Sequence, residues 1–277
     1  MYECINKVHT FIRQTYKIKY FIYVILFFIF VVLSGCNVFK FSPYDDDLET
    51  DIRNSNFKNI IKIENNFTVA EKDSFDFAII SDSHSDYDDL HDVVKWINKN
   101  PNIKFTFFLG DQTDLGLKFE FENTLYELEK LNKPYIVIIG NHDYLSQGKS
   151  IFQQIYGNTN FSFSIGNNKF IGFDNIVWEN DNKRPEFEWL QNELDDKICK
   201  NIFLMMHIPE ESEPMEKYRH EYSIIIKDVP NLYRLHGHTH SLKVEWPKLT
   251  TCEISKKKVP IISVRNSSVE YIIEECK

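Results

Sequence analysis

Apolar and polar positions follow two different rhythms along the middle of the chain. Short apolar runs rich in Phe and Ile occur at 75–80 (FDFAII), 104–109 (KFTFFL) and 135–140 (YIVIIG). Between them, segments 88–100 and 118–132 space their apolar residues three and four positions apart, as at Leu90, Val93, Val94 and Ile97. The runs predict strands and the spacing predicts amphipathic helices. This alternation indicates an α/β domain whose strands are buried on both faces.

The second half of the chain is richer in strands. Residues 160–175 (NFSFSIGNNKFIGFDN) predict a hairpin that turns at Gly166-Asn167-Asn168, and 186–196 predict a helix. Further strands are expected at 201–206, 231–235 and 242–246, with two more within 259–273. Before the first strand, the polar stretch from Asn37 to about Asp73 predicts a tether followed by a short segment that packs on the domain through Ile60, Ile61 and Ile63.

Five of the predicted strands are followed directly by Asp, Asn or His. These residues are Asp82, His84, Asp111, Asp114, Asn141, His142, His207, His238 and His240. The last two belong to RLHGHTHS, which places three histidines in five positions. Open α/β sheets bind ligands at the carboxyl ends of their strands, so five such ends in chain order indicate one composite site. Carboxylate, amide and imidazole ligands without thiolates favour divalent first-row metals.

These segments carry a resemblance to a known family. The chain resembles the calcineurin-like metallophosphoesterase superfamily through DSH (82–84), GDQTD (110–114), GNHD (140–143), MMHIP (205–209) and GHTH (237–240). The resemblance extends from about residue 75 to 245. It implies a four-layer αββα sandwich, in which helices flank two mixed β-sheets.

The resemblance also implies a site with two metal ions, divalent or of mixed valence, drawn from Mn, Fe, Zn and Co. Asp111 would bridge them. The first ion would be held by Asp82, His84, Asp111 and His240, and the second by Asp111, Asn141, His207 and His238. A hydroxide between the metals would attack the phosphoester, His142 would protonate the leaving oxygen, and Asp114 would orient His142.

Residues next to these motifs favour structural interpretations. His236 precedes GHTH and is expected to be packed behind the ligands. Asp143 and Tyr144 are expected to hold the GNHD loop, although Tyr144 is also placed to touch a substrate.

The net charge limits which partners are expected, and the N-terminal sequence indicates where the protein is located. The 277 residues carry a formal charge of -9. Because a negatively charged protein has no broad attraction to nucleic-acid phosphates, we expect no nucleic-acid binding. An apolar run from Tyr20 to Leu33 follows a basic segment and ends in LSGC, which resembles the bacterial lipoprotein box. We therefore expect a signal peptide over 1–35, a lipid on Cys36, and an exported lipoprotein anchored to a membrane of the bacterial cell envelope. An uncleaved signal anchor is the alternative.

The domain organisation that follows is a signal peptide over 1–35, a tether and N-terminal extension over 36–73, and a metallophosphoesterase domain over 74–277. The segment between His207 and the strand at 231 is too short for a separate cap domain. Its acidic residues, Glu210, Glu211, Glu213 and Glu216, are expected at the rim of an open cleft.

The predicted function is metal-dependent phosphoester hydrolysis, with phosphodiesters favoured over monoesters. The alternative is a membrane-anchored lipoprotein that uses the same fold as a binding module without turnover. The sequence leaves the natural substrate, the native metal pair, the membrane side and the oligomeric state open.

Overall fold

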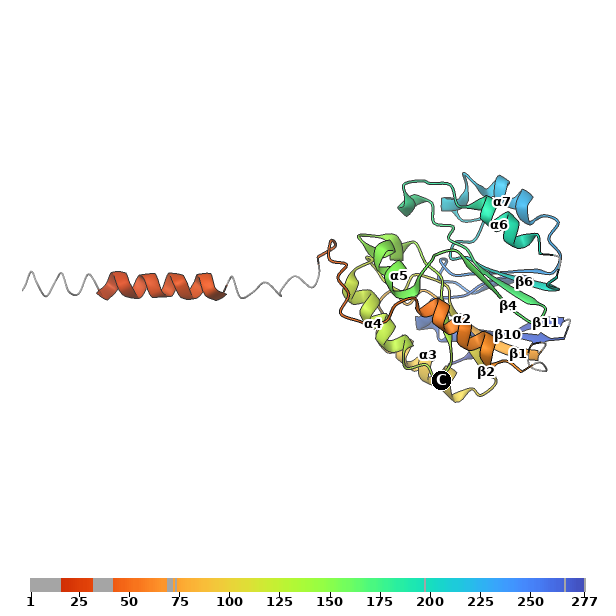
Figure 1. Cartoon of the computed structure of the whole chain (residues 1–277), viewed down its shortest axis with the longest axis horizontal. Coiled ribbons are helices and arrows are strands. Elements are labelled where there is room, and N and C mark those ends of the chain that lie inside the picture. The colour runs from red at the N-terminus through yellow and green to blue at the C-terminus, as the bar shows by residue number, and fades with distance from the viewer. Residues whose placement is uncertain are drawn as a thin grey trace, which may run out of the picture. The chain divides into compact units, whose positions relative to one another are not determined.

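The chain divides into two compact units in a computed structural model, Met1–Ser42 and Pro43–Lys277 (Figure 1). The structure describes residues 16–31, 42–68, 72, 74–196, 198–266 and 268–276. In the first unit it describes one helix, over 16–31. Among these described residues no helix combines the length and the apolar character needed to span a bilayer. The expected lipidation site Cys36 and the rest of LSGC lie outside the described residues.

The second unit contains two mixed β-sheets. The first has the order β11-β10-β1-β2-β3, with β1 parallel to β2 and antiparallel to β10. Its strands are β1 (Ser74–Ile80), β2 (Ile103–Phe108), β3 (Tyr135–Val137), β10 (Lys258–Arg265) and β11 (Ser268–Glu275). The second has the order β4-β5-β6-β7-β9-β8, in which β5, β6, β7 and β9 are parallel to one another and the edge strands β4 and β8 are antiparallel to β5 and β9. Its strands are β4 (Phe161–Ile165), β5 (Asn168–Gly172), β6 (Asn201–Met205), β7 (Leu232–His236), β8 (Lys243–Glu245) and β9 (Lys248–Thr250).

An aromatic core joins the two sheets face to face. Side chains alternate along a strand, so Phe75, Phe77 and Ile79 of β1 enter one core cluster while Ala78 and Ile80 enter another. The first cluster also contains residues of β5, β6 and β7, which places it between the sheets. Phe77 packs there against Phe105, Phe170 and Phe203, with ring centroids 5.2 to 5.6 Å apart.

Helices cover the outer faces of both sheets. The helices α3 (Tyr87–Lys99) and α4 (Lys118–Leu128) share a buried cluster with the outward side chains of β1. The helices α6 (Phe187–Leu194) and α7 (Arg219–Ile226) lie on the second sheet, where Phe187 and Trp189 stack near Phe173. The helix α5 (Gly148–Tyr156) packs beside α4. Helix, sheet, sheet and helix therefore form four layers, which confirms the predicted fold.

Most predicted elements are confirmed, with differences at their ends. The predicted helix 118–132 ends at Leu128, because residues 130 and 131 donate to carbonyls three positions back and tighten the last turn. The predicted strand 135–140 pairs only over 135–137. The hairpin forms with Gly166 at φ 57°, as expected for its turn. The helices α5 and α7 and the strand β9 were not predicted.

The segment predicted as a tether and extension contributes the helix α2 (Ser55–Asn66) to the second unit. This helix lies along β3 and near β4, and Ile60 and Ile63 are buried against the inter-sheet cluster. Asn56 is also buried. Its Nδ2 donates to the Val137 carbonyl at 2.8 Å, and its Oδ1 accepts from the Val137 amide at 2.9 Å. The Asn56 side chain thus pairs with the edge strand β3 as another strand would.

We expect Asn56→Ala to lower the free energy of unfolding by about 2 kcal/mol, because it removes two hydrogen bonds and leaves a buried amide and carbonyl unpaired. Urea denaturation of both variants measures the change. Asn65→Ala, at an exposed position on the same helix, is the matched control and is expected to change stability by less than about 0.5 kcal/mol. Equal effects from the two substitutions would contradict this role for Asn56.

Candidate metal centre

Five strand ends bring the predicted site residues to one edge of the sandwich. The loops after β1, β2, β3, β6 and β7 carry Asp82 and His84, Asp111 and Asp114, Asn141 and His142, His207, and His238 and His240. The backbone there is unusual. Asp82, His84, Asp111, His238 and His240 all have positive φ values between 43° and 72°. Left-handed backbone in non-glycine residues is sparsely populated and clusters at functional sites.

One group of side chains contains Asp82, His84, Asp111 and His240, whose ligand atoms all lie within 4.8 Å of one another. The Nε2 atoms of His84 and His240 are 2.9 Å apart. The His84 Nε2 lies 3.9 Å from Oδ1 of Asp82 and 3.8 Å from Oδ2 of Asp111. Two imidazoles and two carboxylates therefore face one point.

A second group contains Asp111, His207 and His238, and the amide oxygen of Asn141 completes it. The His207 Nε2 lies 3.0 Å from Oδ2 of Asp111 and 3.1 Å from Oδ1 of Asn141. The His238 Nδ1 lies 3.0 Å from the same Asn141 oxygen. Asp111 belongs to both groups.

These spacings fit a divalent cation. Ligand atoms about 2.1 Å from a metal ion in tetrahedral or octahedral geometry are separated by roughly 3.0 to 3.4 Å. The contacts of 2.9 to 3.1 Å between ligand atoms match this separation, and those near 3.9 Å match wider angles. The donor set of oxygen and nitrogen atoms is also the set that such cations bind.

Acceptors behind the imidazoles orient them. The Nδ1 of His207 donates to the Leu109 carbonyl at 2.6 Å. The Nδ1 of His84 lies 3.4 Å from the Asp114 carboxylate, and that of His240 lies 3.5 Å from Glu253. A hydrogen bond holds Nδ1 of His207, and a carboxylate lies near Nδ1 of His84 and of His240, while the other nitrogen of each ring faces the site. This is the usual arrangement around metal-binding histidines.

The buried carboxylate of Asp143 fixes the loop that carries Asp111. It accepts from the amides of Asp111 at 3.0 Å, Gln112 at 3.1 Å and Gly140 at 3.0 Å, and from the Thr113 hydroxyl at 2.9 Å. Burial, with repulsion from Asp111, raises the pKa of Asp143 to about 7. The expected role of Asp143 as a loop anchor is confirmed.

The carboxylates and imidazoles of the site shift one another's pKa values. Burial opposes ionisation of Asp111, but the facing His207 outweighs it and lowers the pKa of Asp111 to about 2. Asp111 in turn outweighs burial at His207 and raises its pKa to about 9. Burial, with repulsion from Asp111, raises the pKa of Asp82 to about 6. Asp111 is therefore the carboxylate that is fully ionised at neutral pH, as suits a shared ligand.

Glycines allow this close approach at two strand ends. A Cβ on Gly140 would collide with the backbone and carboxylate of Asp111, and one on Gly237 would collide with Ser81 and Asp82. The loops can meet only because these positions lack side chains.

Comparison with known families decides the identity of the fold. Residues 75–242 match the family described as calcineurin-like phosphoesterase. The chain belongs to this family. It is accordingly a metal-dependent hydrolase of phosphoric esters, and divalent metal ions are its cofactors. No curated protein matches the chain significantly.

Solved structures share the fold at low sequence identity. A dimetal phosphatase from Danio rerio has 13% identity and a TM-score of 0.53, with 73% of this chain and 99% of that chain covered. GAP50 of Plasmodium, called the anchor in the inner membrane complex, has 14% identity and a TM-score of 0.57, with 74% and 85% covered. The purple acid phosphatase PPD1 from yellow lupin seeds has 10% identity and a TM-score of 0.56. The match covers 73% of this chain and 52% of that chain.

In this phosphoesterase the contact between Asp114 and His142 is made by the main chain. The His142 Nδ1 donates to the Asp114 carbonyl oxygen at 2.8 Å, whereas the Asp114 carboxylate points toward His84. The two rings are also close, with the centroids of His84 and His142 4.7 Å apart. The Asp114 group that contacts the His142 ring is therefore its carbonyl rather than its side chain.

The neighbours of the motifs lie behind or beside the site. His236 is buried, and neither of its ring nitrogens has a hydrogen-bond partner among the described residues. The hydroxyl of Tyr144 is buried and donates to Asp174, so this side chain does not face a substrate. Glu210 pairs with Arg234, and Glu211 pairs with Lys248 at 2.9 Å. The expected acidic rim is therefore partly neutralised.

Two acidic residues at the site were not found from the sequence. Glu179 accepts from Nδ2 of Asn141 at 3.1 Å, and Glu253 lies behind His240. The site residues were predicted because they directly follow apolar strands within a motif. Neither glutamate does so, and the sequence therefore did not indicate them. The fold alone brings them to the ligands.

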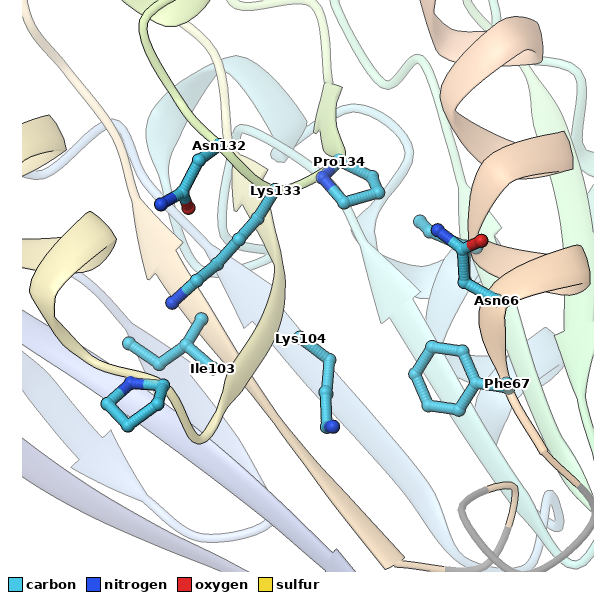
Figure 2. Close-up of a pocket in the computed structure, with 9 residues that line it drawn as sticks. Asn66, Phe67, Ile103, Lys104, Asn132, Lys133 and Pro134 are labelled. Atoms are coloured by element: carbon cyan, nitrogen blue, oxygen red, sulfur yellow. The ribbon is translucent and has the colours of Figure 1, made fainter.

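A hollow of about 290 Å³ lies at the opposite ends of β2 and β3 (Figure 2). It is bordered by Asn66 at the end of α2, by Phe67 after it and by Lys133 before β3. Lys133 donates to the carbonyls of Ile97, at 2.8 Å, and Asn100. This ammonium group caps the carboxyl end of α3, which gives it a structural role far along the strands from the metal centre.

Proposed function

We propose that this phosphoesterase holds two metal ions and hydrolyses phosphodiesters in preference to monoesters. The first ion would be held by Asp82, His84, Asp111 and His240, and the second by Asp111, Asn141, His207 and His238. The observation that carries this proposal is that two separate ligand groups share Asp111. A shared carboxylate is how proteins hold two cations close enough to act on one phosphoryl group.

The bound cations would supply a nucleophile at neutral pH by lowering the pKa of water, and would offset charge on the phosphoryl group. His142 supplies the proton for the leaving oxygen. Because its Nδ1–H donates to the Asp114 carbonyl, its Nε2 is the nitrogen that exchanges a proton with the substrate. The left-handed loops and Asp143 hold these groups in place before the substrate binds.

The charge of the site supports a diester substrate. Among the described residues, the contacts of the candidate ligands and of His142 include no lysine or arginine. A doubly charged monoester would need more positive charge than a singly charged diester. The purified wild-type chain with added Mn tests this preference. We expect kcat/KM for bis-p-nitrophenyl phosphate to exceed that for p-nitrophenyl phosphate by roughly tenfold or more, and a faster monoester reaction would contradict it.

We expect Asp114→Ala to lower kcat/KM by roughly tenfold, the size of effect that a residue behind a metal ligand has. The substitution keeps the carbonyl that orients His142 and removes the carboxylate near His84. Its effect should therefore include weaker Mn binding, measured by the Mn concentration that gives half-maximal activity. A loss as large as that of His142→Asn with unchanged Mn binding would place the catalytic role on the carboxylate.

We also infer that the phosphoesterase is exported and anchored to a membrane of the bacterial cell envelope by a lipid on Cys36, after removal of residues 1–35. The basic segment, the apolar run and LSGC support this location. Mass spectrometry of the protein purified from membranes tests it. The expected mature chain begins at a diacylated Cys36, and Cys36→Ser prevents this processing; an intact, unmodified N-terminus would contradict it.

A further inference from the structure

The start of the catalytic unit packs on the helix that follows the Asp114 loop. Asp45, three residues into the unit, pairs with Lys118 at 2.6 Å, and the Ser150 hydroxyl donates to Asp46 at 3.1 Å. Figure 1 shows this segment running past α4 and α5 before α2. Lys118 is the first residue of α4 and follows Asp114 by four positions, a span of at most about 15 Å. The start of the unit therefore lies on the side of the molecule that carries the Asp114 loop.

The proposed attachment point precedes this start by only a few positions in the sequence. Cys36 and Pro43 are seven positions apart, a span of at most about 25 Å. A unit of this length is roughly 45 Å across. A lipid on Cys36 would therefore hold the face around Pro43 nearer to the bilayer than the opposite face.

Exposed apolar side chains occur on two loops, each next to a residue that contacts the metal centre. Leu115, which is 55% exposed, follows Asp114, whose carbonyl accepts from His142. Trp178, which is 48% exposed, precedes Glu179, which accepts from Asn141. Both side chains are thus one residue away from a group that touches the consecutive pair Asn141 and His142. Tyr44, at the start of the unit, is 81% exposed.

We propose that Leu115 and Trp178 contact the membrane surface and that the substrate is a phosphodiester carried on a lipid. Trp is the side chain that best suits the boundary between headgroups and acyl chains, because its ring is apolar and its N–H is polar. The proposal rests on the proposed phosphodiesterase activity and on attachment at Cys36. It gives the two apolar side chains a partner and brings a lipid-borne substrate to the loops that carry the metal centre.

The charge of the protein indicates which lipid surface is compatible. The chain is acidic overall, and the segment after Pro43 contains three consecutive aspartates at 45–47. Lys118 neutralises Asp45, and Asp46 accepts from Ser150, but the segment still disfavours strongly anionic surfaces. Docking is therefore expected on zwitterionic phosphatidylcholine vesicles, through apolar contact rather than charge.

A matched pair of substrates tests the proposal. Hexadecyl p-nitrophenyl phosphate inserts into vesicles, and ethyl p-nitrophenyl phosphate stays in water, but both release the same p-nitrophenolate. In each, an oxygen from water bonds to phosphorus, the P–O bond to p-nitrophenolate breaks, and an alkyl phosphate remains. With the full lipidated chain in phosphatidylcholine vesicles, we expect kcat/KM for the hexadecyl ester to exceed that for the ethyl ester at least tenfold.

The double variant Leu115→Ser with Trp178→Ser is expected to remove this advantage and leave ethyl ester hydrolysis unchanged. Phe57→Ser with Ile61→Ser, an exposed apolar pair on α2, a helix that contributes no residue to the ligand groups, is the matched control and should retain the advantage. Equal hydrolysis of the two esters by the wild type, or a loss confined to the α2 variant, overturns the proposal. Failure to hydrolyse either ester instead contradicts the phosphodiesterase function itself.

Fluorescence gives a readout that does not depend on turnover. Brominated phosphatidylcholine quenches tryptophans at the bilayer surface. Quenching of the full lipidated chain is expected in the wild type and is expected to fall in Trp178→Phe, which keeps the other three tryptophans. Quenching that is the same in both proteins would show that Trp178 is not at the membrane.

Discussion

Replacing Asp111 by Asn is expected to lower kcat/KM roughly 10⁴-fold, equivalent to about 5.5 kcal/mol of lost transition-state stabilisation. Asp111 is the one side chain common to both ligand groups, and the nearby His207 holds its pKa near 2, so it is ionised under all conditions of interest. Asparagine keeps the shape and the oxygen that accepts from the His142 amide at 2.9 Å, but it removes the charge.

Steady-state kinetics and metal content measured on the same preparation check this result. The matched control is Asp88→Asn, an exposed aspartate on α3, which is expected to leave both quantities unchanged. Retention of metal content and activity by Asp111→Asn would contradict the shared role of Asp111.

The substitution His142→Asn is expected to lower turnover roughly 10³-fold for diphenyl phosphate, within the range for loss of a general acid. The loss should be smaller for bis-p-nitrophenyl phosphate, because p-nitrophenolate is less basic than phenolate and leaves with little help from a proton. His220→Asn, on the exposed side of α7, is the control and should change neither rate.

The leaving-group dependence separates a proton donor from a residue that only stabilises charge. Equal losses for the two esters would assign His142 to charge stabilisation, and undiminished turnover would overturn the proposed mechanism. The non-catalytic alternative, in which the fold serves only as a binding module, predicts no hydrolysis by the wild type at any metal concentration. All seven candidate metal ligands and His142 are present, which favours the enzyme.

The composite site was predictable from the sequence because its polar residues directly follow the apolar runs that form the strands. Apolar runs such as FDFAII fix where strands end, and parallel strands place their carboxyl ends at one edge. Asp82 and His238 therefore had to meet, although they are 156 positions apart. The motif resemblance then supplied the fold, which the two sheets and their helical layers confirm.

Features that depend on contacts across the fold were not predictable. The helix α5 has only nine residues, too few for a clear helical period, and it forms because Ile151 and Phe152 are buried beside α4. Spacing could not distinguish the Asp114 carboxylate from its carbonyl as the group that orients His142. Glu179 and Glu253 reach the site from loops that carry no motif.

Elemental mass spectrometry of the purified wild-type chain, loaded with Mn and freed of excess metal, tests the central claim most directly. Two ligand groups joined through Asp111 predict about two metal ions per chain. A single ion per chain, or none, would contradict the dinuclear site.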